Sequence, residues 1–294
     1  MMESFIRRAE TLIEALPYIQ AFSGKTVVIK YGGHAMQDPL LEDDFARDIV
    51  LLATVGIHPI VVHGGGPQIG RVLEQLGIET RFHEGLRVTD EKTMDVVEMV
   101  LMGLVNGNIV RRINKFGGNA VGLAGKDGNL IRARKMRLRT YEEETDKVDL
   151  GQVGEIDEIR PEILATLIER GFIPVVAPVG QGKNGKALNL NADHVAGRIA
   201  EALRAEKLIL LTDVDGVMDA RGRLLSSLSA REAERLIAEG VIQGGMIPKI
   251  RCVIDAVTNG VEKTHIINGT LPHAVLLEIF TKGGVGTEVV KETR

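Results

Sequence analysis

The 294-residue chain contains one cysteine, Cys252, no tryptophan, and only 3% aromatic residues. A single thiol cannot form an intrachain disulfide, which favours a reducing compartment, and we therefore expect a cytoplasmic protein. Cys252 lies in an apolar helical stretch, so it is predicted to be a buried structural thiol rather than a nucleophile. The scarcity of aromatic rings argues against a surface on which nucleic-acid bases stack.

Long apolar runs and metal-binding patterns are missing as well. No run approaches the ~20 apolar residues of a membrane-spanning helix, so no membrane partner is expected. The formal net charge of −4 argues against a nucleic-acid partner. The basic stretch 132–139 is followed by acidic residues, which favours a solvated hairpin over a nucleic-acid patch. The seven histidines do not have the spacing of a helical metal site, so no protein-held metal is predicted.

Short β-branched runs alternate with helical patterns along most of the chain. The predicted strands are 26–30, 59–63, 119–123, 173–179, 207–212 and 264–268. The predicted helices are roughly 38–55, 67–77, 90–115, 160–170, 191–204, 229–239, 245–258 and 271–280. This alternation predicts an α/β fold with a mainly parallel sheet and helices on both faces. Segment 129–155 interrupts it and is expected to form exposed hairpins, and the polar segment 180–186 is predicted to separate two lobes.

An amphipathic helix is predicted ahead of the first strand. Its apolar positions repeat at helical spacing within 3–16, and Pro17 is expected to end it. The residues on this face are Phe5, Ala9, Leu12, Ile13 and Leu16. The face could pack on its own domain or dock on another subunit.

Two strands end in glycine clusters. The first runs through Lys30 into Gly32 and Gly33, and the second runs into His63 and the glycines 64–66. Glycines let the backbone turn sharply and approach an anion, and free N–H groups at a helix start attract phosphate or carboxylate. Two such cradles on one sheet, one of them beside a lysine, suggest chemistry between a phosphorylated ligand and an acidic one. The competing interpretation of Lys30 is a lysine that extends to solvent from a strand end. His63 is interpreted as a hydrogen-bonded turn residue rather than a general base.

Three further motifs carry polar residues at element ends. Asn189, Asn191 and Asp193 precede an alanine-rich helix; capping explains one of them, and the others could hold a substrate amide, orient lysines or reach Mg²⁺. Asp213 follows a strand, where aspartates commonly face ligand, with an ordinary Asp-Gly turn as the alternative. The glycines 244–245 open a helix that carries Lys249, for which a solvated lysine is the alternative.

Together with the segment 85–89 (Gly-Leu-Arg-Val-Thr), these motifs resemble the amino-acid kinase family over nearly the whole chain. The glycine clusters are widely shared there, whereas Gly-Leu-Arg-Val-Thr and Asn-x-Asn-x-Asp are typical of its acetylglutamate kinases. The resemblance implies a three-layer αβα sandwich around a mainly parallel sheet. It also implies ATP-dependent phosphorylation, with Mg²⁺, of the side-chain carboxylate of N-acetyl-L-glutamate, a step of arginine biosynthesis.

The resemblance also assigns roles to segments and residues. It implies an oligomerisation helix at 1–20, an N-terminal lobe at 21–180 for acetylglutamate binding and dimerisation, and an ATP-binding lobe at 181–294. Lys30 and Lys249 would flank the transferred phosphoryl group, and Asp193 would organise both lysines. The implied substrate contacts are Gly65, Gly66, Arg87, Asn189 and Asn191. The implied nucleotide contacts are Gly32, Gly33, Asp213 and Gly245.

The N-terminal helix resembles that of arginine-inhibited members, which are hexamers built as trimers of dimers. L-Arginine is then the expected inhibitor, bound near Tyr18, His265, Glu278 and Gly284. A nitrogen-signalling protein is a further candidate partner. The alternatives are another kinase of the family, acting on glutamate, aspartate or uridylate, and a non-catalytic sensor of arginine or nucleotide. Two retained lysines argue against a sensor, which needs no paired charges to stabilise a phosphoryl group.

Overall fold

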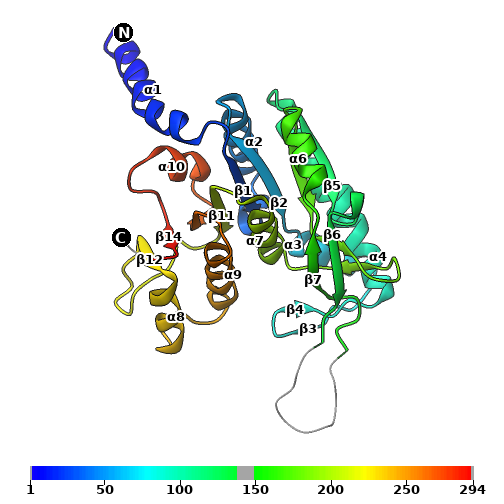
Figure 1. Cartoon of the computed structure of the whole chain (residues 1–294). Coiled ribbons are helices and arrows are strands. Elements are labelled where there is room, and N and C mark those ends of the chain that lie inside the picture. Colours follow the sequence, from blue (N-terminus) through cyan, green and yellow to red (C-terminus); the bar gives the residue numbers. More distant parts are fainter. Residues whose placement is uncertain (1, 138–148, 293–294) are drawn as a thin grey trace.

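The computed structural model of the protein describes residues 2–137 and 149–292. An eight-stranded sheet lies at its centre in the order β12-β14-β13-β11-β1-β2-β8-β5 (Figure 1). All neighbouring strands in it are parallel except β13 and β14. The strands are β1 (Thr26–Tyr31), β2 (His58–His63), β5 (Ala120–Ala124), β8 (Ile173–Ala177), β11 (Lys207–Thr212), β12 (Ser227–Ser229), β13 (Lys263–Asn268) and β14 (Thr287–Val290). The six predicted strands are confirmed, and the short strands β12 and β14 at one end of the sheet were not predicted.

Helices cover both faces of this sheet. One face carries α2 (Pro39–Thr54), α3 (Gly66–Gln75), α4 (Glu91–Glu98), the π-helical η2 (Met99–Val105), α5 (Asn106–Lys115) and α10 (Ala274–Phe280). The other face carries α6 (Glu162–Glu169), α7 (Ala192–Leu203), α8 (Ala230–Ala238) and α9 (Met246–Thr258). Alternate residues of β1 enter the two cores, with Val27 and Ile29 in one and Val28 in the other. The predicted three-layer αβα sandwich is therefore confirmed.

The smaller sheets lie beside the main one. A four-stranded sheet has the order β10-β9-β6-β7 and consists of β6 (Ile131–Lys135), β7 (Gly154–Ile159), β9 (Val179–Gln181) and β10 (Ala187–Asn189). Strands β3 (Phe82–His83) and β4 (Leu86–Arg87) form a hairpin, and short 3₁₀ turns occur at η1 (Gly33–Met36) and η3 (Asp127–Asn129). The polar segment 180–186 includes the end of β9 and the turn that leads to β10, and the assignment of lobes on its two sides stays a prediction.

The segment 129–155 was expected to form exposed hairpins, and β6 and β7 do pair antiparallel there. Residues 138–148 lie outside the described residues. Basic residues of β6 form ion pairs with acidic neighbours, such as Arg134 with Glu155 at 2.9 Å and Arg134 with Asp157 at 2.7 Å. This local neutralisation agrees with a solvated hairpin.

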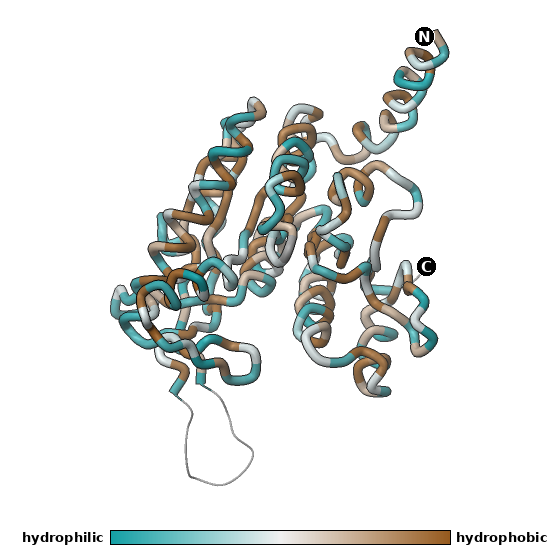
Figure 2. The backbone as a smooth tube through the Cα atoms, turned by 180° about the vertical axis from the view of Figure 1, so that it is seen from behind, coloured by the Kyte–Doolittle hydropathy of each residue, from teal (hydrophilic) through white to brown (hydrophobic). Residues whose placement is uncertain are grey.

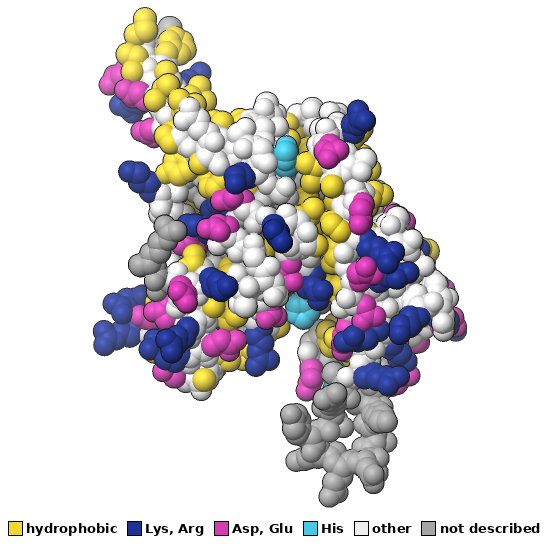
Figure 3. Space-filling model, in the orientation of Figure 1, with side chains coloured by type: hydrophobic (Ala, Val, Ile, Leu, Met, Phe, Trp, Pro, Cys, Tyr) yellow, Lys and Arg dark blue, Asp and Glu magenta, His cyan; other side chains and the backbone are white. Residues whose placement is uncertain are grey.

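The first helix, α1 (Met2–Phe22), is longer than predicted and projects from the body of the molecule (Figures 1 and 2). The expectation that Pro17 ends it was wrong. A proline removes one helical N–H, and at a solvent-exposed position water can hydrogen-bond the carbonyl left without a partner. No side chain of α1, which is described in full, is buried. Hydrophobic side chains stand on its outside (Figure 3), including Phe5, Leu12 and Ile13 at 53%, 71% and 67% exposure.

The predicted helix 90–115 is the continuous stretch formed by α4, η2 and α5, and its π-helical middle was not predicted. By length and composition this stretch could cross a membrane, but half of its most apolar window is buried inside the molecule, as in a core helix. The predicted helix 271–280 starts three residues later, at Ala274, because His273 adopts the left-handed φ of 56°.

Cys252 is buried in α9 as predicted, and its thiol donates a hydrogen bond to the Asp193 backbone carbonyl at 3.1 Å. Burial raises the pKa of the Cys252 thiol well above its ordinary value. A reactive thiolate is therefore disfavoured at this position.

Candidate active site

The two glycine clusters meet at one edge of the sheet; residues 32–33 after β1 are called the first glycine segment, and residues 64–66 after β2 are called the second. Strands β1 and β2 are parallel with Tyr31 opposite His63, so both glycine segments leave at the same level. The Gly64 N–H donates to the Tyr31 carbonyl at 2.8 Å. A Cβ on Gly32 would lie 3.0 Å from Lys30 Nζ and 3.8 Å from the Gly64 Cα. The glycines thus leave the space that the lysine ammonium and the neighbouring backbone occupy.

Asp193 binds two lysines that come from different elements. Lys30 Nζ, at the end of β1, lies 3.0 Å from Asp193 Oδ1, and Lys249 Nζ, in the first turn of α9, lies 2.7 Å from Asp193 Oδ2. Burial raises the pKa of Asp193, but the two lysine charges and their hydrogen bonds outweigh it and lower the pKa to about 2. The group therefore carries one excess positive charge at neutral pH, which suits an anionic ligand.

The start of α7 fixes the position of Asp193. Asn191 is the N-cap of α7, and its Oδ1 accepts hydrogen bonds from the N–H groups of Asp193 at 2.9 Å and His194 at 3.2 Å. Capping therefore uses the Asn191 carbonyl oxygen and leaves its amide NH₂. Asn189, in β10, donates from Nδ2 to Thr89 Oγ1 at 3.3 Å, which joins the Asn-x-Asn-x-Asp motif to the end of Gly-Leu-Arg-Val-Thr.

Arg87 lies beside the second glycine segment. Its guanidinium donates to the Gly66 carbonyl and to Thr80 Oγ1, both at 3.1 Å, and lies 4.7 Å from the centre of the Phe82 ring. Burial lowers the pKa of Arg87. A Cβ on Gly66 would meet no atom within 4 Å, so there is open space beside Gly66 at the start of α3. Arg87, Gly65 and Gly66 are therefore brought together.

The predicted nucleotide residues gather around the neighbouring strand end. Gly33 has a φ of 72°, and a Cβ on it would lie 2.5 Å from Asp213 Oδ1, so Asp213 packs directly against the first glycine segment. Gly245 is the N-cap residue of α9 and lies four positions before Lys249; as a glycine it makes no side-chain capping hydrogen bond. The described structure thus places this set next to the Lys30, Asp193 and Lys249 group.

Three of the four predicted effector residues, His265, Glu278 and Gly284, form a separate cluster. His265 Nδ1 lies 2.7 Å from Glu278 Oε1, and Gly284, with a φ of 59°, leaves no room for a Cβ beside Glu278 Oε2, 2.7 Å away. Sequence reasoning missed Lys207, which begins β11 and lies 3.1 Å from His265 Nε2, because a lysine that starts a buried strand carries no motif. Burial lowers the pKa of Lys207. Tyr18 is in α1, whose last residue Phe22 lies 5.2 Å from the Lys207 ammonium.

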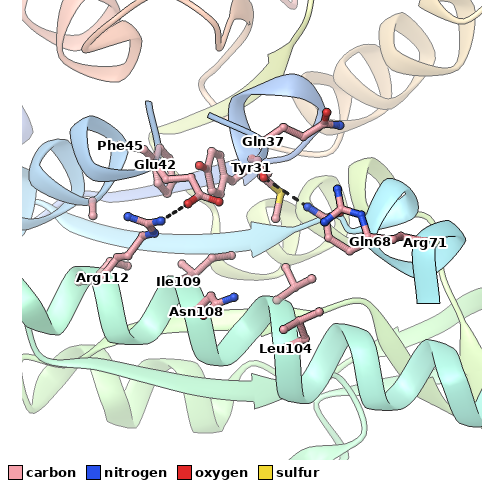
Figure 4. Close-up of a pocket in the computed structure, with 14 residues that line it drawn as sticks. Tyr31, Gln37, Glu42, Phe45, Gln68, Arg71, Leu104, Asn108, Ile109 and Arg112 are labelled. Atoms are coloured by element: carbon pink, nitrogen blue, oxygen red, sulfur yellow. Dashed lines mark hydrogen bonds and ion pairs between the residues drawn. The ribbon is translucent and has the colours of Figure 1, made fainter. Parts of the chain in front are cut away.

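A cavity of about 270 Å³ lies on the α2 and α5 side of the sheet (Figure 4). The rings of Tyr31 and Phe45 stack in its wall at 3.8 Å, and Glu42 forms an ion pair with Arg112 there. The cavity shares no lining residue with the predicted site, and no sequence motif marked it. It contributes no residue to the chemistry discussed below.

Comparisons with known proteins agree with this geometry. Residues 25–268 match the model of the amino acid kinase family, and the chain belongs to that family. It is similar to the acetylglutamate kinase of Acinetobacter baumannii, with 57% identity over 291 residues that cover 98% of this chain and 96% of that protein. The acetylglutamate kinase of Acinetobacter baylyi is 59% identical over 284 residues, covering 96% of this chain and 94% of its own.

Solved structures show the same fold. The N-acetylglutamate synthase of Neisseria gonorrhoeae, complexed with coenzyme A and N-acetyl-glutamate, superposes with a TM-score of 0.86 at 29% identity over 97% of this chain. This chain spans 64% of the synthase chain. The synthase complexed with coenzyme A and L-arginine has a TM-score of 0.82 at 28% identity and covers 97% of this chain and 66% of its own.

Proposed function

We propose that this protein transfers the γ-phosphoryl group of MgATP to the side-chain carboxylate of N-acetyl-L-glutamate, forming N-acetyl-L-glutamyl 5-phosphate for arginine biosynthesis. The observation that carries the proposal is the arrangement of Lys30 and Lys249 on the two oxygens of Asp193, at the edge where both glycine segments meet. The high identity to two acetylglutamate kinases supports the choice of substrate.

The reaction needs charge stabilisation rather than a general base. The substrate carboxylate is already ionised at neutral pH, so it needs no base. One carboxylate oxygen attacks the γ-phosphorus of ATP while the bond between that phosphorus and the bridging oxygen of ADP breaks. Negative charge spreads over the transferred group, where Lys30 and Lys249 act from two sides. Asp193 holds both ammonium groups in place, and backbone N–H groups of the glycine segments hold the oxygens. ADP leaves with the electron pair of the broken P–O bond.

Magnesium enters as part of the MgATP substrate. Within the described residues there is no group of three or more His, Cys, Asp or Glu side chains that could hold a metal ion. Both carboxylate oxygens of Asp193 are engaged by the two lysine ammonium groups. Its role is therefore to orient lysines.

Substrate and nucleotide occupy neighbouring parts of the edge. Arg87 suits the α-carboxylate, because its planar guanidinium can bind two oxygens at once. Asn189 and Asn191 offer the amide groups that acetylglutamate can hydrogen-bond. Gly32, Gly33, Asp213 and Gly245 would line the nucleotide in the lobe 181–294 and at the first glycine segment, while residues 21–180 would bind acetylglutamate. We propose a cytoplasmic location for this biosynthetic step.

We also propose that L-arginine inhibits the enzyme and that the assembly is a hexamer of three dimers. The exposed apolar side chains of α1 support an intersubunit contact, because a helix with this face gains stability by packing. Tyr18, His265, Glu278 and Gly284 would hold arginine where α1 meets α10, and these two helices pack on each other. A nitrogen-signalling protein remains a candidate partner of the assembly.

A coupled assay of ADP release tests the function. The enzyme is offered N-acetyl-L-glutamate, L-glutamate, L-aspartate and UMP in turn, each with MgATP. We expect turnover with the first substrate far above the others. Turnover led by UMP or free glutamate would point to another kinase of the family. Binding of arginine without turnover of any substrate would point to a sensor.

A further inference from the structure

Two buried side chains, His63 and Asn106, support the second glycine segment from the interior of the protein. Neither is among the substrate or nucleotide contacts proposed above. His63, the last residue of β2, is fully buried, with Nδ1 2.7 Å from the Gly64 carbonyl oxygen and Nε2 3.1 Å from Asn106 Nδ2. A carbonyl oxygen only accepts, so Nδ1 carries the ring hydrogen and Nε2 accepts from Asn106. Asn106 also donates to the Val175 carbonyl at 2.9 Å, so both hydrogens of its amide are used.

This contact determines where the next N–H group points. All described peptide bonds are trans, so the Gly64 carbonyl and the Gly65 N–H lie in one peptide plane and point in opposite directions. Because the carbonyl is held toward the buried His63 ring, the Gly65 N–H is directed away from it. None of the described residues accepts a hydrogen bond from the Gly65 N–H. The orientation of one ring therefore sets the direction of the Gly65 N–H.

The π-helical turn η2 completes this support. The Asn106 N–H bonds to the Leu101 carbonyl, five residues back, and Asn106 follows η2 directly. A Cβ on Gly65 would lie 2.5 Å from Leu101 Cδ2 and 3.4 Å from Val105 Cγ2, so η2 packs on the glycine segment. On the other side, a Cβ on Gly122 would lie 2.0 Å from Asn106 Oδ1. Gly122 thus leaves the space in which the Asn106 amide sits.

We propose that His63 and Asn106 are positioning residues for phosphoryl transfer: Asn106 selects the ring tautomer of His63, and His63 turns the Gly64–Gly65 peptide so that its N–H faces the transferred group. This inference rests on the proposed role of the second glycine segment. Neither side chain touches substrate. The pair acts through the backbone, so it affects the transition state, in which the oxygens demand well-aligned donors, more than ground-state binding.

The tautomer can be measured without turnover. Nitrogen-15 NMR of histidine-labelled protein distinguishes a ring protonated at Nδ1 from one protonated at Nε2, and the signal absent from His63→Asn identifies His63. Burial lowers the pKa of His63 to about 4, so its ring stays neutral at pH 6. We expect the Nδ1–H form in the wild type. An Nε2–H form would overturn the proposal, whatever the behaviour of the variants.

Asn106→Leu tests the contribution to rate, with Asn114→Leu as its matched control. Asn114 is in the same helix and also joins it to the sheet, accepting from the Ala120 N–H at 2.6 Å, but it does not contact His63. We expect Asn106→Leu to lower kcat by ~10-fold or more relative to Asn114→Leu, with KM values for both substrates within about threefold. Equal kcat values in the two variants would overturn the positioning role.

Two substitutions of His63 separate its hydrogen bonds. Asparagine can place an N–H near the position of Nδ1 and keeps the donor to Gly64, whereas glutamine can place an oxygen near Nε2 and keeps only the acceptor for Asn106. His63→Asn should therefore retain more kcat than His63→Gln, and the reverse order would overturn the assignment. A wild-type enzyme that releases no ADP with N-acetyl-L-glutamate would instead overturn the proposed function.

Discussion

Lys249 Nζ lies 2.7 Å from Asp193 Oδ2, although the two residues are 56 positions apart and belong to different helices. The contact joins the first turn of α9 to the first turn of α7, at two helix N-termini that both carry partial positive charge. Lys30 reaches the other oxygen of the same carboxylate at 3.0 Å. One buried aspartate thus sets the distance between two lysines that come from different secondary-structure elements.

Lys30→Ala or Lys249→Ala should lower kcat by ~10²–10³, because each removes one preorganised charge from the transferred group. The melting temperature should change little, since Asp193 keeps the other lysine as its partner. Steady-state kinetics and thermal melts measure the two effects. Lys115→Ala is the control, because Lys115 forms an exposed ion pair with Asp43 at 3.1 Å and such pairs contribute little. Near-full kcat in either site variant would contradict the assigned role.

N-Acetyl-L-glutamate should be preferred over L-glutamate by as much as ~10⁴-fold in kcat/KM. A site that hydrogen-bonds an amide is left with unpaired polar groups when the ligand lacks that amide. Asn189 and Asn191 supply the amide groups that would be left unpaired. Comparable kcat/KM values for the two substrates, measured in the same ADP-release assay, would show that the acetyl group is not recognised.

Asp48→Asn should stabilise the protein above pH 6. Burial raises the pKa of Asp48 from 3.8 to about 6, against the opposing effect of His273, whose Nδ1 lies 2.6 Å away. Because the folded state binds this proton more tightly than the unfolded state, the stabilisation is full below about pH 4 and is lost as pH rises through about 6. A difference of about two pH units between the two pKa values corresponds to up to about 3 kcal/mol.

Denaturant unfolding at pH 4 and pH 7.5 measures this difference. The gain of Asp48→Asn over the wild type should be present at pH 7.5 and vanish at pH 4, since asparagine does not titrate. Asp44→Asn is the control, because Asp44 lies farther from His273, at 3.7 Å, and is more exposed than Asp48. A destabilised Asp48→Asn at pH 7.5 would show that the contact of the Asp48 carboxylate with His273 outweighs the cost of burial.

Deletion of residues 1–20 should convert a hexamer into dimers, keep catalytic activity and weaken inhibition by L-arginine. The reason is that α1 has no fully buried side chain within its own subunit while it exposes an apolar face. Arginine must also bind the inhibited state better than the active one, or it shifts nothing. Light scattering measures the particle, and a dose–response curve measures inhibition.

Substitutions in the full-length chain separate loss of the face from loss of the segment. Leu12→Glu with Ile13→Glu should reproduce the deletion, whereas Glu10→Gln with Glu14→Gln, on the polar positions, should not. A full-length enzyme that ignores millimolar arginine would contradict the regulatory proposal. A truncated enzyme that stays hexameric would contradict its structural basis.

The sequence by itself determined the layers of the fold and the identity of most candidate site residues. Both follow from local patterns. Residues that alternate between strand and helix periodicity must bury their apolar faces against one another, and glycines after a strand indicate a close approach of backbone to ligand. Lys30, Asp193 and Lys249 were each marked by their position at the end of a strand or the start of a helix. The path of α1 past Pro17 was not, because an exposed helix tolerates the proline.

Only the tertiary structure decided which side chains meet. Nothing local to Asn106 indicates His63, 43 residues earlier, because their contact depends on the π-helical turn of η2 and on the space left by Gly122. The same holds for Lys207 against His265 and for the sharing of one Asp193 carboxylate by two lysines. Distances of about 3 Å between residues far apart in sequence arise from the packing of helices on the sheet, and sequence spacing does not contain that packing.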